Sequence, residues 1–150
     1  MCMRCDGYSW DEIDRHTDLM IRVHGYLMLH VGDQAGSWTY TIGTIESWDQ
    51  PELIVLDVEP ELQAVLVHAV ADDYVRHGEV RDDTLDMLDV ELVPVDESHF
   101  TAGMVAAWEE RYSMVPQAGD FVQIVPGSSW FCPAHAARVR KLCAGAFPEA

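Results

Sequence analysis

The sequence predicts a single α+β domain over residues 1–150: a single-layer, mainly antiparallel sheet of about five strands with three to four helices packed on it. Three observations support this. Apolar residues recur at helical spacing in well-separated stretches. Short apolar or alternating runs lie between those stretches. The first three such runs follow one another closely, which favours antiparallel pairing. No repeat or linker divides the 150 residues, which suffice for one hydrophobic core.

The first helix is predicted between Ser9 and Gly25. Ser9 and Glu12 have the spacing of a capping box, in which each side chain binds a backbone N–H of the other residue. Gly25 has the position of a glycine that ends a helix. The apolar face between them carries Ile13, Thr17, Met20, Ile21 and His24.

The remaining elements follow from the same patterns. Strands are predicted at residues 26–31, 38–42, 53–56, 88–92 and 121–125, because these runs are apolar or alternate with polar residues. A second helix starts after Pro60 and ends at Gly78. A third is capped by Ser98 and reaches Tyr112, and a short closing helix covers 134–142. We expect the helices to cover one face of the sheet.

The charge is strongly acidic and unevenly distributed. Twenty-six Asp and Glu against nine Lys and Arg give a net charge of −17, and residues 46–110 hold eighteen of the acids with two bases. A phosphate backbone would be repelled, so no direct nucleic-acid binding is expected. Two interpretations remain for the acidic segment 46–110. It is a solvated surface, or it docks on a basic protein partner, in one form as an inhibitor that mimics DNA.

Composition also predicts the compartment. No run approaches the roughly 18 apolar residues that span a bilayer, so no membrane association is expected. The first residues lack the apolar stretch of a secretory signal, and we therefore expect a cytoplasmic protein. In a reducing cytosol, four cysteines favour a metal site over disulfides.

The strongest motif consists of two short pairs of potential metal ligands, Cys2-x-x-Cys5 and Cys132-Pro-Ala-His135. Zinc prefers four tetrahedral ligands, thiolate sulfur and imidazole nitrogen among them, and a two-residue spacer lets both members of a pair reach one ion. Cys2, Cys5, Cys132 and His135 would complete the coordination shell. The predicted cofactor is therefore a structural zinc that holds the two ends of the chain, not a catalytic one.

Other roles for these cysteines fit the sequence less well. A thioredoxin-like redox pair would need a strand before Cys2, where only Met1 stands. A disulfide is disfavoured in the reducing cytosol. Cys143 lies outside both pairs and is expected to be an incidental thiol. Removal of Met1 would make Cys2 an amino-terminal nucleophile with its own amine as base.

A pocket at the aromatic strand and turn of residues 38–43 is the alternative hypothesis for a site. Tyr40 and Thr41, with His24 at the end of the first helix, are its candidate residues. This pocket would make the protein a small enzyme, the alternative to a binding module. Core packing explains the aromatic residues equally well.

Several motifs, taken together and in order, resemble a known family. They are Met1-Cys2-x-x-Cys5-Asp6-Gly7, His24-Gly25, Trp38-Thr39-Tyr40-Thr41-Ile42-Gly43, Pro51-Glu52-Leu53, Val93-Pro94-Val95, Phe121-Val122-Gln123 and Trp130-Phe131-Cys132-Pro133-x-His135. The sequence is similar, over residues 1 to about 142, to the bacterial family catalogued as domain of unknown function forty-two sixty-two.

The resemblance implies a compact α+β domain of bacteria and their phages, with no established activity. Gln50 departs from the family pattern, in which relatives often have histidine before Pro51-Glu52-Leu53. The closed set of four zinc ligands and the acidic segment 46–110 lead us to expect a protein-interaction or binding module with a structural zinc. The sequence names neither its partner nor its oligomeric state.

Overall fold

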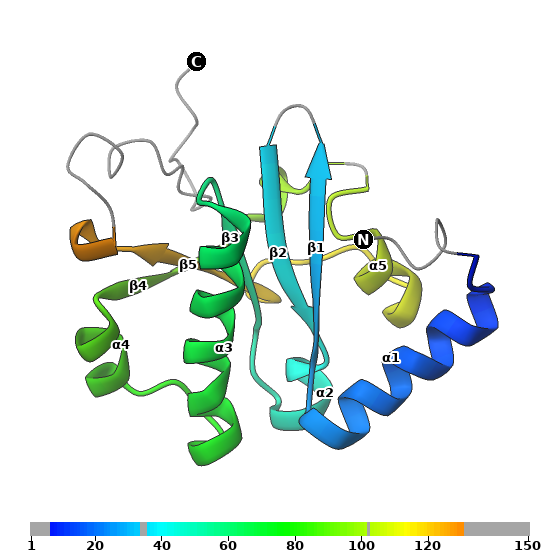
Figure 1. Ribbon diagram of the computed structural model, residues 1–150, viewed down its shortest axis with the longest axis horizontal. Helices are drawn as coiled ribbons and strands as arrows, with labels where there is room; N and C mark the ends of the chain where they lie inside the picture. The colour runs from blue at the N-terminus through cyan, green and yellow to red at the C-terminus, as the bar shows by residue number, and fades with distance from the viewer. Residues whose placement is uncertain (1–6, 34–35, 102, 131–150) are drawn as a thin grey trace.

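Five strands form one mixed sheet in the order β1-β2-β3-β5-β4 (Figure 1). The computed structural model describes residues 7–33, 36–101 and 103–130. The strands are β1 (Leu27–Asp33), β2 (Gly36–Ile42), β3 (Glu52–Leu56), β4 (Val90–Pro94) and β5 (Phe121–Pro126). The helices are α1 (Trp10–His24), α2 (Thr44–Trp48), α3 (Pro60–His77), α4 (Asp82–Leu88) and α5 (Ala106–Tyr112), with 3-10 turns η1 (Glu97–His99) and η2 (Ser128–Trp130).

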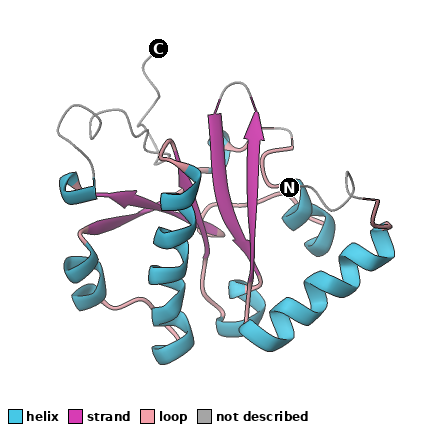
Figure 2. Cartoon of the chain, in the orientation of Figure 1, coloured by secondary structure: helices cyan, strands magenta, loops and turns pink. Residues whose placement is uncertain are grey.

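Three of the four strand pairs are antiparallel. β1 pairs with β2, β2 with β3, and β4 with β5 in this way, whereas β3 and β5 run parallel with Glu52 opposite Phe121. The parallel pair requires a long connection, and α3, α4, β4 and α5 lie between its two strands in sequence. Figure 2 distinguishes the helices, in cyan, from the strands of the sheet, in magenta. The predicted α+β class with a mainly antiparallel sheet is confirmed.

Helix α1 has the ends predicted from the sequence. The Ser9 hydroxyl accepts from the Glu12 N–H at 3.1 Å, and the Glu12 carboxylate accepts from the Ser9 N–H at 3.1 Å. Gly25 then takes a left-handed conformation with φ 89° and donates its N–H to the Ile21 carbonyl. Ile21 is the buried residue of this helix, so its last turns are anchored while its first turns extend outward (Figure 1).

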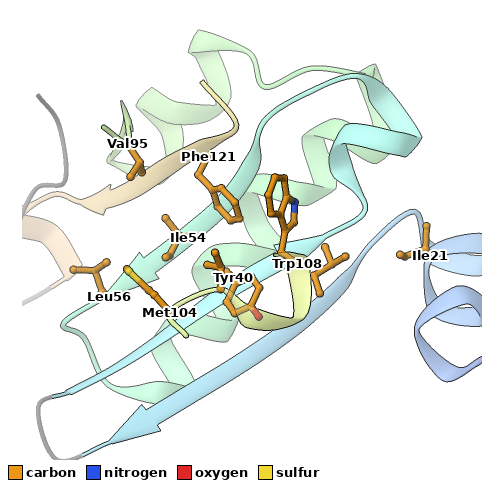
Figure 3. Packing of buried hydrophobic residues seen from close by; sticks show 10 residues of the cluster. Ile21, Tyr40, Ile54, Leu56, Val95, Met104, Trp108 and Phe121 are labelled. Atoms are coloured by element: carbon orange, nitrogen blue, oxygen red, sulfur yellow. The ribbon is translucent and has the colours of Figure 1, made fainter. Parts of the chain in front are cut away.

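The sheet is covered on both faces, which corrects the expectation of one covered face. Alternate residues of β3 point to opposite sides: Ile54 and Leu56 join one core cluster, Leu53 and Val55 the other. The first cluster packs against α5 and the end of α1, and Figure 3 shows Trp108 from α5 against Phe121 of β5. The second packs against α3.

The third predicted helix begins later than expected. Ser98 is not its cap: the Asp96 side chain accepts from the Ser98 N–H and caps the short turn η1. Gly103 then has φ 81°, which interrupts helical geometry, and α5 starts at Ala106. The short helices α2 and α4 were not predicted at all.

Two further expectations concern the ends of the chain and the membrane. The predicted closing helix at residues 134–142 lies outside the described residues. None of the helices in the described ranges combines the length and apolar character that crossing a bilayer requires.

Candidate functional site

The residues of the predicted pocket occupy different environments. Tyr40 is 2% exposed and packs edge-on against Phe121, with ring centroids 6.3 Å apart. Burial raises the pKa of Tyr40 to about 12. Thr41 is fully buried, and its side chain points away from Tyr40 because strand neighbours alternate. His24 is exposed in the last turn of α1. Tyr40 and Thr41 are therefore part of the packed interior.

Thr41 instead forms a hydrogen bond with a buried acid, Glu52, which is not among the site residues predicted from the sequence. Glu52, the first residue of β3, is 0% exposed. Its carboxylate accepts hydrogen bonds from the Thr41 hydroxyl at 2.8 Å and from the backbone N–H groups of Gly43 at 2.9 Å and Thr44 at 3.0 Å. The Trp108 indole donates a further bond at 3.2 Å. No described base forms a salt bridge with it.

The environment of Glu52 can accommodate both of its protonation states. Burial raises its pKa, and the hydrogen bonds from Thr44, Gly43 and Thr41 oppose this rise. The Thr44 hydroxyl lies 2.7 Å from Glu52 Oε1 and 2.9 Å from the Pro51 carbonyl. It can donate to an ionised Glu52. Alternatively, it can accept from a protonated Glu52 and donate to Pro51.

Glu52 joins three elements, of which α5 is distant in sequence. Its donors come from the end of β2, from the start of α2 and from α5 on one face of the sheet. The Thr41 hydroxyl also accepts from the Leu53 N–H at 2.9 Å, which continues the β2–β3 pairing by one step. Because no part of Glu52 reaches solvent, its role is to hold these elements together rather than to meet a substrate.

A groove lies between α1 and α5, and we call it the α1–α5 groove. It has a cavity volume of about 810 Å³. The α1 residues that line the groove lie on one face of the helix, and Ile42 at the end of β2 forms the bottom of the groove. Its lining comprises Trp10, Ile13, Asp14, Thr17, Asp18, Ile42, Ala106, Ala107, Glu110 and Arg111.

An arginine holds the two walls of the groove together. Arg111 of α5 donates to both carboxylate oxygens of Glu46 on α2, at 2.8 and 3.1 Å, and to Asp18 on α1 at 2.7 Å. The Tyr112 hydroxyl also donates to Glu46. The Arg111 side chain is 23% exposed, so solvent screens this network only in part. The hydrogen bonds from Arg111 lower the pKa of Glu46.

Replacing Arg111 with alanine is expected to lower the free energy of unfolding by about 1–2 kcal/mol. A bidentate, partly buried ion pair stabilises the folded state more than an exposed pair does. The matched control is Arg76→Ala, which removes an exposed pair with Asp72 on α3. That change should cost about 0.3–0.5 kcal/mol. Urea unfolding of both variants measures the difference, and equal losses would contradict the role given to Arg111.

The contribution of the Arg111–Glu46 ion pair to the free energy of unfolding should also depend on pH. Because the folded pKa of Glu46 lies below its ordinary value of 4.5, its stabilisation is present above that value and is lost as the pH falls through the lowered pKa. The stability difference between the wild type and Arg111→Ala should therefore be constant near neutrality and shrink below about pH 4. A difference that persisted in acid would show that packing, not charge, holds α5.

The predicted metal ligands Cys2, Cys5, Cys132 and His135 all lie outside the described residues. Within the described ranges, no group of three or more His, Cys, Asp or Glu side chains is placed to hold a metal ion. The zinc site therefore stays a prediction.

Glu52 and Arg111 form most of the hydrogen bonds of the site, and the sequence contains only weak signals for both. Glu52 directly precedes the apolar run Leu53–Leu56 at the start of a central strand, where a charge is unusual. Such a position indicates a satisfied buried acid, but its donors lie up to 56 residues away. Arg111 is one of the few bases after the acidic segment, and nothing local points to its partners.

These features define the class of protein: a small α+β domain with a mixed five-stranded sheet and a buried, fully hydrogen-bonded carboxylate at its centre. The chain belongs to the family described as Domain of unknown function (DUF4262), whose model matches residues 20–125. The match includes Glu52 and all of the sheet except Pro126, the last residue of β5. No curated protein and no solved structure gave a significant match.

Proposed function

We propose that this domain is a protein-interaction module that binds a short basic and apolar segment of a partner protein in the α1–α5 groove. The observation that carries the proposal is the chemistry of the lining. Apolar side chains line the walls and bottom, and Asp14 on one wall and Glu110 on the other add negative charge. The positive charge of Arg111 is already offset by Glu46 and Asp18.

The groove is suited to a peptide because one of its walls is an exposed helix face. Trp10 is 61% exposed, and Ile13 and Thr17 are partly exposed one and two turns further along α1. Trp10 and Ile13 provide successive apolar anchor points for a segment laid along the helix, and Thr17 adds a polar position one turn further. The surrounding carboxylates favour lysine or arginine between those anchors and speed the encounter electrostatically.

The lining gives less support to an enzyme. Among the described residues that line it, the titratable groups are Asp14, Asp18, Glu110 and Arg111, and there is no histidine, cysteine or serine. The Thr17 hydroxyl donates to the Ile13 carbonyl of its own helix at 2.9 Å. A nucleophile beside a base, the usual sign of covalent catalysis, is therefore not found among the residues that line the groove.

A DNA mimic is supported less than a peptide-binding module. The acids of residues 46–110 lie on elements of both faces of the sheet, among them α3 and α5. Glu52 and Asp73 are buried, and Glu46 is paired with Arg111. A mimic would need rows of exposed carboxylates on one face, to replace a phosphate backbone.

The test is selection of peptides from a random display library, followed by affinity measurements with purified variants. Selected peptides should combine apolar residues with Lys or Arg. Ala107→Arg, which adds bulk and positive charge inside the groove, should weaken their binding at least 10-fold, which is about 1.4 kcal/mol. Val65→Arg is the matched control, since Val65 is exposed on α3 at the other face of the sheet.

Two results would contradict the proposal. One is selection of acidic peptides, and the other is equal weakening by Ala107→Arg and Val65→Arg. Binding should also weaken as salt rises, because the rim carboxylates act through exposed charge.

A further inference from the structure

The two edges of the sheet differ in how they are protected. β1 and β4 are the edge strands, and among the described strands β1 pairs with β2 alone and β4 with β5 alone (Figure 1). An edge strand presents unpaired backbone N–H and C=O groups, which can pair with a strand of another chain. Proteins block such edges with proline, charged side chains or short strands.

The β4 edge is short and contains a proline. The Val95 N–H, just after β4, donates to the Phe121 carbonyl at 3.0 Å, so Val95 faces β5. Because the backbone direction alternates along a strand, Val93 also faces β5, whereas Pro94 directs its nitrogen outward. Proline has no N–H, so the outer side of β4 lacks a donor at this position. A further strand could not form a complete ladder there.

The β1 edge is longer and has no such block. Asp33 and Gly36 are partners in the β1–β2 register with only two residues between them, so they must exchange both backbone hydrogen bonds. By alternation from this pair, the residues Met28, His30 and Gly32 direct their N–H and C=O groups away from β2. The seven residues of β1 include no proline, and Asp33 is the one residue of the strand that is Asp, Glu, Lys or Arg.

The described side chains leave the outer side of β1 accessible. His30 and Gly32 are exposed, and Met28 is partly exposed. The His30 Nδ1 lies 3.0 Å from the Thr39 hydroxyl on β2, so the imidazole leans over its own sheet. Outside the regular ladders, no backbone hydrogen bond between described residues involves Met28, His30 or Gly32. The described part of one chain therefore does not use these outward groups.

We propose that β1 pairs with β1 of a second copy of this chain, antiparallel and across a two-fold axis beside His30. The two five-stranded sheets then form one continuous sheet. In this register His30 lies opposite the partner's His30, and Met28 lies opposite the partner's Gly32. The three outward N–H groups of each copy donate to the other copy, which gives six backbone hydrogen bonds between the copies.

The strand is complementary to itself in this register, which favours a second copy as the partner. On the face toward α3, the large Met28 side chain meets the partner's Gly32, which has no side chain. On the opposite face, Leu29 meets the partner's Val31, and both positions are only partly buried within one copy. Such apolar cross-strand pairs stabilise a sheet. The two-fold axis repeats both contacts on its other side.

The acidity of the chain opposes this contact only at long range. Residues 28–32 contain no Asp, Glu, Lys or Arg, so the charges of two chains of net −17 repel from outside the paired strands. Physiological salt screens exposed charges over about 8 Å. Dimerisation should therefore strengthen as salt rises, whereas peptide binding in the α1–α5 groove should weaken. The two proposals can thus fail separately.

Gly32→Pro and Gly32→Ala form a matched pair of variants. Gly32 lies outside the left-handed φ range, and a Cβ added there would make ordinary contacts, 3.7 Å from Ser37 Cβ and 3.8 Å from His30 Nε2. Alanine keeps the outward N–H, whereas proline removes it. Sedimentation velocity should show a dimer for the wild type and Gly32→Ala. The dissociation constant of Gly32→Pro should be at least 10-fold higher, because two of the six bonds are lost. Circular dichroism checks that both variants are folded.

Hydrogen exchange of the wild type gives a measurement without mutation. The amides of Met28, His30 and Gly32 should exchange slowly in concentrated protein and rapidly after dilution. Those of Leu29 and Val31 bond to β2 and should exchange slowly in both samples. A wild type that stays monomeric at about 1 mM would overturn the proposal. So would outward amides that are insensitive to dilution, or a Gly32→Pro dimer as tight as that of Gly32→Ala.

Discussion

Replacing Glu52 with alanine is expected to unfold the domain at room temperature. The change removes the acceptor for two backbone N–H groups, a tryptophan indole and a threonine hydroxyl, all in the interior. Each buried donor left without a partner costs about 1–3 kcal/mol, and the cavity costs about 2–5 kcal/mol. The sum matches the whole stability of an ordinary domain, about 5–15 kcal/mol. Circular dichroism and urea unfolding measure the loss.

Glu52→Gln separates the charge from the hydrogen bonds. Glutamine keeps the shape and removes the buried charge, but one of its two terminal atoms becomes a donor. Either orientation directs an NH₂ group at a backbone N–H, of Gly43 or of Thr44. We expect a loss of about 1–3 kcal/mol, smaller than that of alanine. Glu97→Ala, at an exposed acid in η1, should change stability by less than about 0.5 kcal/mol.

If Glu52→Gln were as stable as the wild type or more stable, the account of Glu52 as a double acceptor would be wrong. Desolvation of the charge would then be the dominant effect.

Gly43→Ala is expected to have the second largest effect, about 3 kcal/mol or more. Gly43 has φ 119°, a conformation that side chains avoid, and donates its N–H to Glu52. An added Cβ would lie 2.9 Å from the Gly25 carbonyl oxygen and 2.9 Å from Ile21 Cγ1. The backbone contact cannot be relieved by a rotamer change, so the turn between β2 and α2 must shift.

Gly78→Ala is the matched control for this substitution. Gly78 also has a positive φ, 75°, but nothing lies within 4 Å of a Cβ added there. Its cost should be limited to backbone strain, about 1 kcal/mol. Thermal unfolding of both variants gives the contribution of the close contact by difference, and equal shifts in Tm would contradict it.

The sequence predicted those elements whose signals are local. The capping box of Ser9 and Glu12 and the glycine at position 25 define α1, and both are found as expected. The five residues of α2 are too few to show a helical period, and its N-cap Gly43 makes no side-chain cap bond. Ser98 resembled a helix cap, but its neighbour Asp96 provides the cap of a shorter turn.

The candidate site could not be predicted because it depends on long-range contacts. Glu52 is one of the acids of residues 46–110, which were expected to form a charged surface. In the structure it is buried, and Trp108, 56 residues later, donates a hydrogen bond to it. The Arg111 pair with Asp18 spans 93 residues. Periodicity and spacing describe neighbours along the chain, and neither indicates which distant groups meet when α5 packs on the sheet.

The position of β5 has a consequence for how the chain folds as it is made. β5 is the last described strand, yet it lies inside the sheet, and β4 pairs with β5 alone among the described strands. A nascent chain that ends before Phe121 can form β1, β2 and β3 as a meander, but β4 has no neighbour to join. The apolar side of β4 then stays unpaired until the last of the described strands has been synthesised, which makes synthesis of residues 121–126 the step that completes the described sheet.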